Sequence, residues 1–244
     1  MKCFKYSFIV WLFIAASAFS SAVKTAPGNI VVVELFTSEG CSSCPSADAA
    51  VTRLAGEFKD EMIVLAYHID YWNRLGWKDK FSRAEYTSRQ SAYANKFSLN
   101  SIYTPQALVN GTNQLVGSEE AKLRGLIKKA SGLPSRSHSE IQATVTAKGE
   151  IAVSATSNAS SNQTLNIVLV QRQGMSKVTA GENTGKQLSH TDIVRELKTF
   201  NSRDGKVNMK LPAGLKPGDC KVVAFLQNID SFEISGASLA AIQP

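Results

Sequence analysis

Two apolar segments on either side of a Cys-x-x-Cys-Pro motif constrain the fold of this chain more than any other feature. Residues 30–37 and 62–69 are rich in β-branched and aliphatic side chains, which is typical of strands buried on both faces. Between them, apolar residues recur at helical spacing over residues 45–58, and Pro45 suits the first turn of a helix. We therefore expect a strand–helix–strand unit with parallel strands and a right-handed crossover.

The cysteine motif lies at the expected start of that helix, where it favours redox chemistry. A helix N-terminus stabilises negative charge, so it lowers the pKa of a nearby cysteine, and the thiolate is the reactive form. By this reasoning Cys41 is the exposed nucleophile, and Cys44, one turn further on, is the more buried resolving thiol. Such a pair can attack, form a mixed disulfide and resolve it.

Two other interpretations of the cysteine pair stay open from the residues alone. The pair could form an inert structural disulfide after export. It could also supply two ligands of a copper or zinc site, although zinc usually takes four ligands and the sequence has no second Cys-x-x-Cys or His-x-x-x-His. Only Cys220 and the histidines could complete such a site, so we assign no metal-binding residues and expect no cofactor.

The N-terminal segment has the composition of a secretory signal peptide. Lys2 and Lys5 precede an apolar stretch at residues 8–16, which is too short for a comfortable transmembrane span, and small residues lead to a cleavage point after Ala22. We expect residues 1–22 to be removed, the protein to be periplasmic or secreted, and no stable membrane anchor to remain.

Composition and charge exclude several classes of protein. Hydrophobic residues make up 43% of the chain and charged residues 19%, so neither intrinsic disorder nor collagen-like structure is expected. The chain has 27 basic and 20 acidic residues but no run of five or six like charges, so we expect no nucleic-acid partner. Four cysteines are too few for a disulfide-dense scaffold in 244 residues.

An aromatic-rich segment, about residues 70–99, is expected as a helical insertion. Its first part, residues 70–81, is interpreted as a loop that carries Trp72 and Trp77, and residues 82–97 contain no Gly or Pro and predict a helix. The aromatic side chains favour a small satellite core, while a surface for a client peptide or for a second domain is the alternative.

Two histidines stand near carboxylates in the sequence. His68 lies two residues before Asp70, and His190 begins a polar cluster with Asp192. A His–Asp pair can shuttle protons, but we expect a structural histidine at position 68, and a solvated strand or an interface network around His190. Cys220 precedes an apolar strand, and a buried unreactive thiol is expected there.

The spacing of apolar residues changes after a Ser/Gly/Pro-rich linker at residues 131–139. Several short apolar or alternating segments follow, each of strand length and separated by Gly, Asn, Ser and Asp. They predict a β-sandwich. We therefore expect two domains after the signal peptide: an α/β domain of residues 23–133 with the insertion, and an all-β sandwich-like domain of residues 138–244.

The first of these domains resembles the thioredoxin superfamily. The resemblance rests on the expected strand at residues 30–37, which is followed by a Cys-x-x-Cys at the start of a helix. It also rests on Tyr103-Thr104-Pro105, which precede an expected hairpin and final helix in residues 106–130. It implies a thioredoxin-like fold in which Pro105 is cis and, with Thr104 before it, faces the cysteine pair.

The resemblance also implies a buried acid in the first strand that accepts a proton from the resolving thiol. Glu34 is the candidate, although its offset from Cys41 is one residue longer than in thioredoxins. A shift of one residue turns a strand side chain to the other face unless a bulge absorbs it.

A closer resemblance covers nearly all of the chain after residue 22. Residues 32–45, 67–79, 103–106 and 181–197 are similar to segments of a family of exported bacterial proteins catalogued as a domain of unknown function. This resemblance implies a fold and an exported location but supplies no substrate.

Together these observations predict a thiol–disulfide oxidoreductase that acts on a periplasmic protein or a small thiol. Cys41 attacks, Cys44 resolves, and Thr104 and Pro105 position the mixed disulfide. The alternatives are a non-enzymatic binding protein with a structural disulfide, or a protein that handles copper or zinc.

Overall fold

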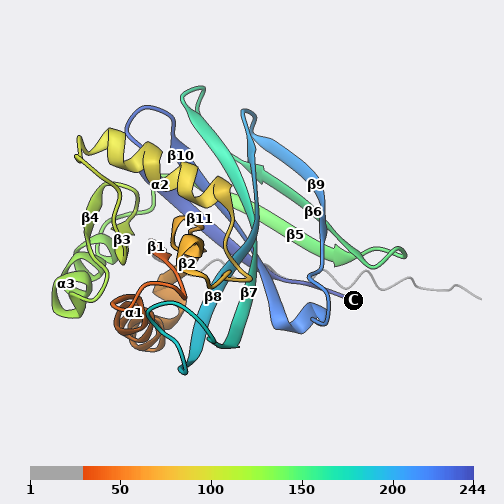
Figure 1. The fold of residues 1–244 in the computed structure, drawn as a ribbon. Helices are drawn as coiled ribbons and strands as arrows, with labels where there is room; N and C mark the ends of the chain where they lie inside the picture. Colours follow the sequence, from red (N-terminus) through yellow and green to blue (C-terminus); the bar gives the residue numbers. More distant parts are fainter. Residues whose placement is uncertain (1–29) are drawn as a thin grey trace, which may run out of the picture.

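The computed structural model describes residues 30–244, whose fold is shown in Figure 1. The predicted signal peptide, residues 1–22, lies outside the described residues. Strands β1 (Val31–Thr37) and β2 (Met62–His68) are buried along their whole length, as their continuous apolar runs require. They pair in parallel and are connected by helix α1 (Cys44–Phe58). The predicted strand–helix–strand unit is confirmed.

The rest of the first half contains the hairpin and the helices expected from the sequence. Asn110 and Gly111 form the hairpin turn, where their φ angles of 47° and 69° lie in the left-handed region that Asn and Gly tolerate. A short 3-10 segment precedes the second helix within the aromatic-rich segment. The elements in order are η1 (Lys59–Glu61), η2 (Tyr71–Leu75), α2 (Ala84–Lys96), β3 (Gln106–Val109), β4 (Asn113–Val116) and α3 (Glu120–Ser131).

The second half of the described chain consists mainly of strands. The apolar pattern predicts only the middle parts of β7 and β8, because the ends of both strands are polar and partly exposed. It does not predict β11, whose alternation of apolar and small residues is weak. The elements in order are β5 (Ser139–Val145), β6 (Glu150–Ser157), β7 (Gln163–Lys177), β8 (Gln187–Phe200), β9 (Asp204–Lys210), η3 (Pro217–Asp219), β10 (Cys220–Asn228) and β11 (Ile234–Ala241).

The strands form two sheets, of which the larger combines both halves of the chain. Eight strands follow the order β11-β10-β7-β8-β2-β1-β3-β4, and three strands form a second sheet in the order β5-β6-β9. The two halves meet where β2 pairs in parallel with β8, with Ala66 opposite Ile193. The large sheet is therefore mixed, since β3, β7 and β10 pair antiparallel with their neighbours.

The predicted fold class is wrong. A thioredoxin-like α/β domain followed by a separate β-sandwich requires two independent sheets, whereas residues 30–244 form a mostly β protein with one eight-stranded sheet, a second sheet and only three α-helices. The physical reason is the edge of β2, whose backbone groups need a partner strand, and β8 supplies it. An apolar pattern predicts a strand but not the edge with which that strand pairs. The domain boundary placed at residues 131–139 stays a prediction.

Three groups of buried side chains join the layers. On one face of the large sheet, α2 packs Tyr86 and Tyr93 against strands from both halves of the chain. On the other face, α1 and α3 cover β1 and β3, while the second sheet covers β7 and β10. Figure 1 shows α1 and α3 at one end of the large sheet and β5, β6 and β9 at the other. The aromatic-rich segment therefore supplies a layer of the main core rather than a satellite core.

Among the described helices, none combines the length and the apolar character needed to cross a membrane.

Candidate functional site

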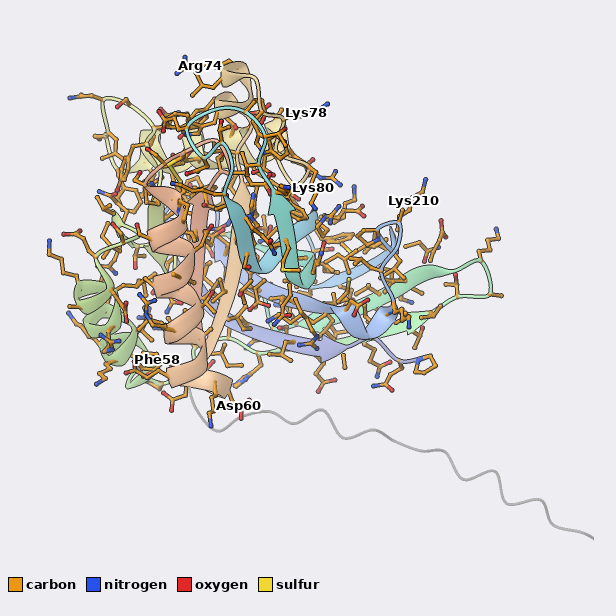
Figure 2. The ribbon with its side chains drawn as sticks, turned by 60° about the horizontal axis from the view of Figure 1, so that its bottom comes forward. Phe58, Asp60, Arg74, Lys78, Lys80 and Lys210 are labelled. Atoms are coloured by element: carbon orange, nitrogen blue, oxygen red, sulfur yellow. A yellow bond between two sulfur atoms is a disulfide. The ribbon has the colours of Figure 1, made fainter. Side chains whose placement is uncertain are left out.

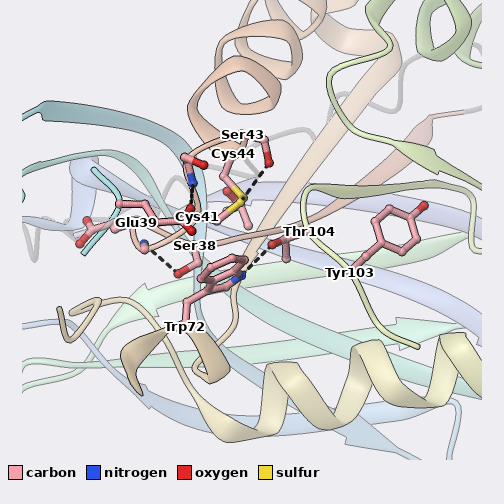
Figure 3. Close-up of a disulfide and its surroundings, with 12 residues drawn as sticks. Ser38, Glu39, Cys41, Ser43, Cys44, Trp72, Tyr103 and Thr104 are labelled. Carbon is pink, nitrogen blue, oxygen red and sulfur yellow. Dashed lines mark hydrogen bonds between the residues drawn. A yellow bond between two sulfur atoms is a disulfide. The ribbon is translucent and has the colours of Figure 1, made fainter. Parts of the chain in front are cut away.

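The cysteine pair forms a disulfide at the start of α1 (Figure 3). The Cα atoms of Cys41 and Cys44 are 5.4 Å apart. The Cys44 N–H donates to the Cys41 carbonyl and the Cys41 N–H donates to the Ser38 carbonyl, both at 3.2 Å, so two tight turns lead into the helix. Cys44 is the first residue of α1, where the helix dipole stabilises a thiolate. The loop therefore presents a disulfide at the end of a helix that favours its opening to a thiolate.

Both cysteines are buried in this state. Cys41 is 1% exposed and Cys44 is fully buried, whereas Ser42 and Ser43 between them are exposed. The Ser43 hydroxyl lies 3.4 Å from Cys41 Sγ, within hydrogen-bonding distance for sulfur. The predicted exposure of Cys41 is therefore wrong for the disulfide form, and a client must displace covering groups to reach Sγ.

The Thr104–Pro105 peptide bond is cis, as predicted. Trp72 links this segment to the cysteine loop, because its indole N–H donates to Thr104 Oγ1 at 2.8 Å. Trp72 also packs so closely on Gly40 that a Cβ at position 40 would lie 2.9 Å from the Trp72 Cβ. Figure 3 shows the indole between the cysteine loop and Thr104. The structure thus brings the predicted site residues Cys41, Cys44 and Thr104 to one end of the sheet.

The segment between β7 and β8 also packs on the cysteine loop. The side-chain amide of Asn183, which is fully buried, donates to the carbonyls of Glu39 and Cys41 at 2.9 Å each. Glu182 Oε2 accepts a hydrogen bond of 2.9 Å from the Ser42 N–H. Sequence reasoning missed both contacts, although the similarity of residues 181–197 to the family of unknown function was a signal that this segment matters.

A buried histidine from β8 stands next to two carboxylates beside the cysteine loop. His190 Nδ1 is 3.0 Å from Asp48 Oδ2, and Asp48 lies one helical turn after Cys44. His190 Nε2 is 3.3 Å from Glu39 Oε1, which is ion-pair distance without the alignment of a hydrogen bond. Thr37 Oγ1 donates to the other Asp48 oxygen at 3.0 Å. The predicted network around His190 therefore faces the first half of the chain.

A second histidine packs on the first. The ring of His68 lies 4.7 Å from that of His190, nearly perpendicular to it. Its Nδ1 is 2.7 Å from Asp79 Oδ2, which also accepts the Glu39 N–H at 3.0 Å. His68 is therefore paired with Asp79 and not with Asp70, whose Oδ1 accepts the hydroxyl of Thr87 at 2.6 Å. Asp79 is a partner that the sequence did not indicate, and the structural role of His68 stays a prediction.

Competition between burial and pairing sets the pKa values of this cluster. Burial lowers the pKa of His190, but the hydrogen bond to Asp48 and the nearby charges of Asp48 and Glu39 outweigh burial and raise this pKa to about 9. Burial raises the pKa of Glu39, and contacts with His190 and Trp77 reverse that effect, so the pKa lies below its ordinary value. The pKa of Asp79 is lowered in the same way, because His68 outweighs burial. The cluster therefore holds an imidazolium between carboxylates.

Glu34 is not brought to the disulfide. Its neighbours Val33 and Leu35 pack beneath α1, so the alternation of a strand turns Glu34 to the opposite face of the sheet. There its Oε1 accepts a 2.7 Å hydrogen bond from Arg89 Nε, and its Oε2 accepts the hydroxyl of Tyr93. The Arg89 guanidinium balances the charge of this fully buried carboxylate.

The third cysteine of the described chain lies apart from the pair. Cys220 is 1% exposed in the core between the two sheets, and burial raises the pKa of its thiol to about 11. This agrees with the predicted buried unreactive thiol. No group of three or more His, Cys, Asp or Glu within residues 30–244 is arranged to hold a metal ion.

Residues 32–227 match the sequence profile of a family described as "Protein of unknown function (DUF1223)". The chain belongs to this family. The matched range of DUF1223 includes the cysteine pair, Pro105, Asn183 and His190, and therefore both halves of the site. None of the curated proteins gives a significant match.

Two solved structures are similar to this DUF1223 protein. A crystal structure of a protein from Agrobacterium tumefaciens is 26% identical, with a TM-score of 0.66 over 88% of this chain and 95% of that chain. HBP35 of Porphyromonas gingivalis is 16% identical, with a TM-score of 0.67 over 91% of this chain and 78% of that chain. The second likeness concerns the fold alone.

Proposed function

We propose that this protein carries out thiol–disulfide exchange through Cys41 and Cys44 on a thiol or disulfide of an exported protein or small molecule. The observation that carries the proposal is a disulfide at the N-terminus of α1, beside the cis Thr104–Pro105 bond and linked to it through Trp72. This local arrangement is similar to that of thioredoxins, although the whole fold differs. A helix N-terminus supports the reaction because it stabilises the leaving thiolate.

In the direction that reduces the disulfide, a client thiolate attacks Cys41 Sγ. A bond forms between the client sulfur and Cys41, the Cys41–Cys44 bond breaks, and Cys44 leaves as a thiolate with the electron pair of that bond. A second client thiolate then attacks the client sulfur, and Cys41 leaves as a thiolate. Two electrons pass from the client dithiol to the cysteine pair. In the reverse direction the Cys41 thiolate attacks a client disulfide, and Cys44 resolves the mixed disulfide.

We propose a periplasmic or secreted location for this chemistry. The composition of residues 1–22 supports it, and a cysteine pair in the disulfide form is typical of oxidising compartments.

The test combines the reduction potential of the cysteine pair with exchange assays on insulin and on glutathione. We expect a potential more oxidising than about −300 mV, since more reducing values are typical of structural disulfides. Cys41→Ser should abolish exchange, while Cys220→Ala, in a separate core, should leave it unchanged. A wild-type protein inactive in both assays and in both directions would overturn the proposal.

The burial of Cys41 favours one second candidate function. Cys41 is only 1% exposed. A disulfide buried to this extent is also expected in a non-enzymatic binding protein, where it would serve only to stabilise the fold. This candidate predicts a potential below about −300 mV. It also predicts that dithiothreitol reduces the disulfide only when the protein unfolds. The potential and the reduction rate of the folded protein therefore separate the two functions.

A further inference from the structure

Basic side chains gather at the end of the molecule that carries the disulfide. Figure 2 shows Arg74, Lys78 and Lys80 together beside the loop between β7 and β8, while Phe58 marks the far end of α1. Because α1 begins at Cys44 and ends at Phe58, the cysteine pair lies at the same end as these side chains. The basic rim is the set of exposed residues at this end: Arg74, Lys78, Lys80, Lys177 and Lys186.

The basic rim is connected to the cysteine loop through Asn183 and Trp77. Lys186 Nζ donates to Asn183 Oδ1 at 2.9 Å, and the amide group of Asn183 donates to the Cys41 carbonyl. Lys78 follows Trp77, whose indole N–H donates to Glu39 Oε2 at 2.7 Å. The rim therefore borders the segments that cover Cys41.

The charges of the basic rim are not neutralised within the described residues. None of the five side chains forms an ion pair there; Lys80 and Lys186 donate only to uncharged oxygens, of Met175 and Asn183. Of the acids in the same segments, Asp79 is buried against His68, while the exposed Glu182 accepts the Ser42 N–H and offsets one of the five positive charges. This end of the molecule therefore presents positive charge to a partner.

Glu182 illustrates how a carboxylate binds at this end. It is exposed, yet its Oε2 accepts the Ser42 N–H at 2.9 Å, next to the first turn of α1. Hydrogen bonds from Ser42 lower the pKa of Glu182. The cysteine loop therefore holds one acidic side chain, that of Glu182, and a client carboxylate would replace it at the Ser42 N–H.

Apolar surface lies beside the same charges. Met175 is 61% exposed and Leu75 is 36% exposed, and Trp72 and Trp77 are half-buried. Basic side chains around apolar and aromatic surface fit a peptide segment better than a small anion, because a segment contacts both at once.

We propose that the client is a polypeptide segment whose reacting cysteine is flanked by acidic residues, and that this segment docks on the basic rim. The inference rests on the proposed exchange at Cys41 and names its substrate class. Positive charge beside the reactive sulfur attracts such a segment and raises its rate of encounter by about 10-fold or more at low salt.

The experiment uses three peptides that differ only in the residues beside a single cysteine, which are acidic, neutral or basic. The rate at which each peptide thiol opens the Cys41–Cys44 disulfide is divided by its rate with a small uncharged disulfide, which corrects for differences in thiol pKa. We expect the acidic peptide to react about 10-fold faster than the neutral one at low salt. The difference should vanish at about 0.5 M salt, where screening acts over only a few ångströms.

A charge-matched pair of variants tests the surface itself. Arg74→Glu with Lys78→Glu should abolish the preference for the acidic peptide over the neutral one. Lys206→Glu with Lys210→Glu, two exposed residues of β9, changes the net charge equally and should keep the preference. Figure 2 shows Lys210 away from the rim.

The outcomes separate the two proposals. If none of the three peptides and not even glutathione reacts with the Cys41–Cys44 disulfide, the proposed function is overturned. Exchange at equal normalised rates, or a preference that both double variants lose equally, would overturn only the inference about the client. Glutathione reacting as fast as the acidic peptide, after the same normalisation, would replace the polypeptide with a small anionic thiol.

Discussion

Raising the pH from about 6.5 to about 9 should destabilise this protein through the single imidazole of His190. In the folded protein the pKa of His190 is raised from its ordinary value of 6.5 to about 9. The folded state therefore binds this proton more tightly than the unfolded state does. The resulting stabilisation is complete below about pH 6.5 and is lost as the pH rises through about 9.

The magnitude follows from the difference between the two pKa values. At about 1.4 kcal/mol per pKa unit, the free energy of unfolding should fall by about 3 kcal/mol in all. His190 is only 3% exposed, so solvent screening requires no discount. Glu39 and Asp79 have lowered pKa values, so their contributions are lost only as the pH falls through the acidic range. They do not mask the fall above pH 6.5.

The assay is urea unfolding of the oxidised protein, followed by tryptophan fluorescence, at several values from about pH 6.5 to about pH 8.5. Over this window the wild type should lose about 2 kcal/mol. The series stops below pH 9 because the Cys220 thiol, with a pKa of 9.0 when unfolded and about 11 when folded, adds its own dependence above that point.

Two histidine variants complete the design. His190→Gln should remove the pH dependence and also cost about 3–5 kcal/mol near pH 6, because it leaves Glu39 and Asp48 buried without their cation. His138→Gln, at an exposed position, should behave like the wild type. If the free energy of unfolding of the wild type does not change with pH over this range, the reasoning is refuted whether or not His190→Gln folds. It is also refuted if the free energy of unfolding of His190→Gln falls with pH as steeply as that of the wild type.

Three further predictions concern the packing of the cysteine loop, the cover over Cys41, and the buried Arg89–Glu34 pair on the opposite face of the sheet. Gly40→Ala should lower the free energy of unfolding by about 1–3 kcal/mol, because the added Cβ would collide with Trp72. Gly56→Ala should raise the free energy of unfolding by about 0.5–1 kcal/mol, because the space around that position is open. Urea unfolding measures both changes. Asn183→Ala should cost about 2 kcal/mol and speed reduction of the disulfide by dithiothreitol, since two buried carbonyls lose their donor; an unchanged reduction rate would contradict this. Arg89→Met should cost about 3–5 kcal/mol in thermal or urea unfolding, and adding Glu34→Leu should recover most of the loss.

The parts of the fold predicted correctly are those that local pattern determines. The apolar runs of β1 and β2 allow little but buried strands, and Asn110-Gly111 allows little but a tight hairpin. The spacing of Cys41 and Cys44 at a helix start brings their sulfurs together within one turn. These features depend on neighbours a few residues away, so the sequence is sufficient to predict them.

The parts that were missed depend on contacts between distant segments. His68 has Asp70 two residues away, but the chain folds back through η2 and places Asp79 against the imidazole instead. Neither the burial of Glu39 nor its proximity to His190 leaves a periodic pattern, because a single buried polar residue does not change the spacing of its neighbours. The pairing of β2 with β8 is of the same kind, since strand edges are satisfied by backbone groups that every residue carries.

Asn183 shows why residue type alone is a weak guide. Its segment is rich in Gly, Asn and Thr, a composition that predicts a loop, and such loops are usually exposed. Its amide is nevertheless fully buried against the carbonyls of the cysteine loop. Similarity of this segment within the family was the only signal available before the structure.

The parallel pairing of β2 with β8 has a consequence for how this protein can be divided. A fragment that stops at residue 133 lacks the strand that covers the edge of β2, and it also lacks the histidine that balances Glu39 and Asp48. We therefore expect the cysteine-bearing half to be unstable when it is excised or transferred alone between relatives. Chimaeras of such proteins should exchange both halves together, because the residues that complete the cysteine loop lie more than a hundred positions further along the chain.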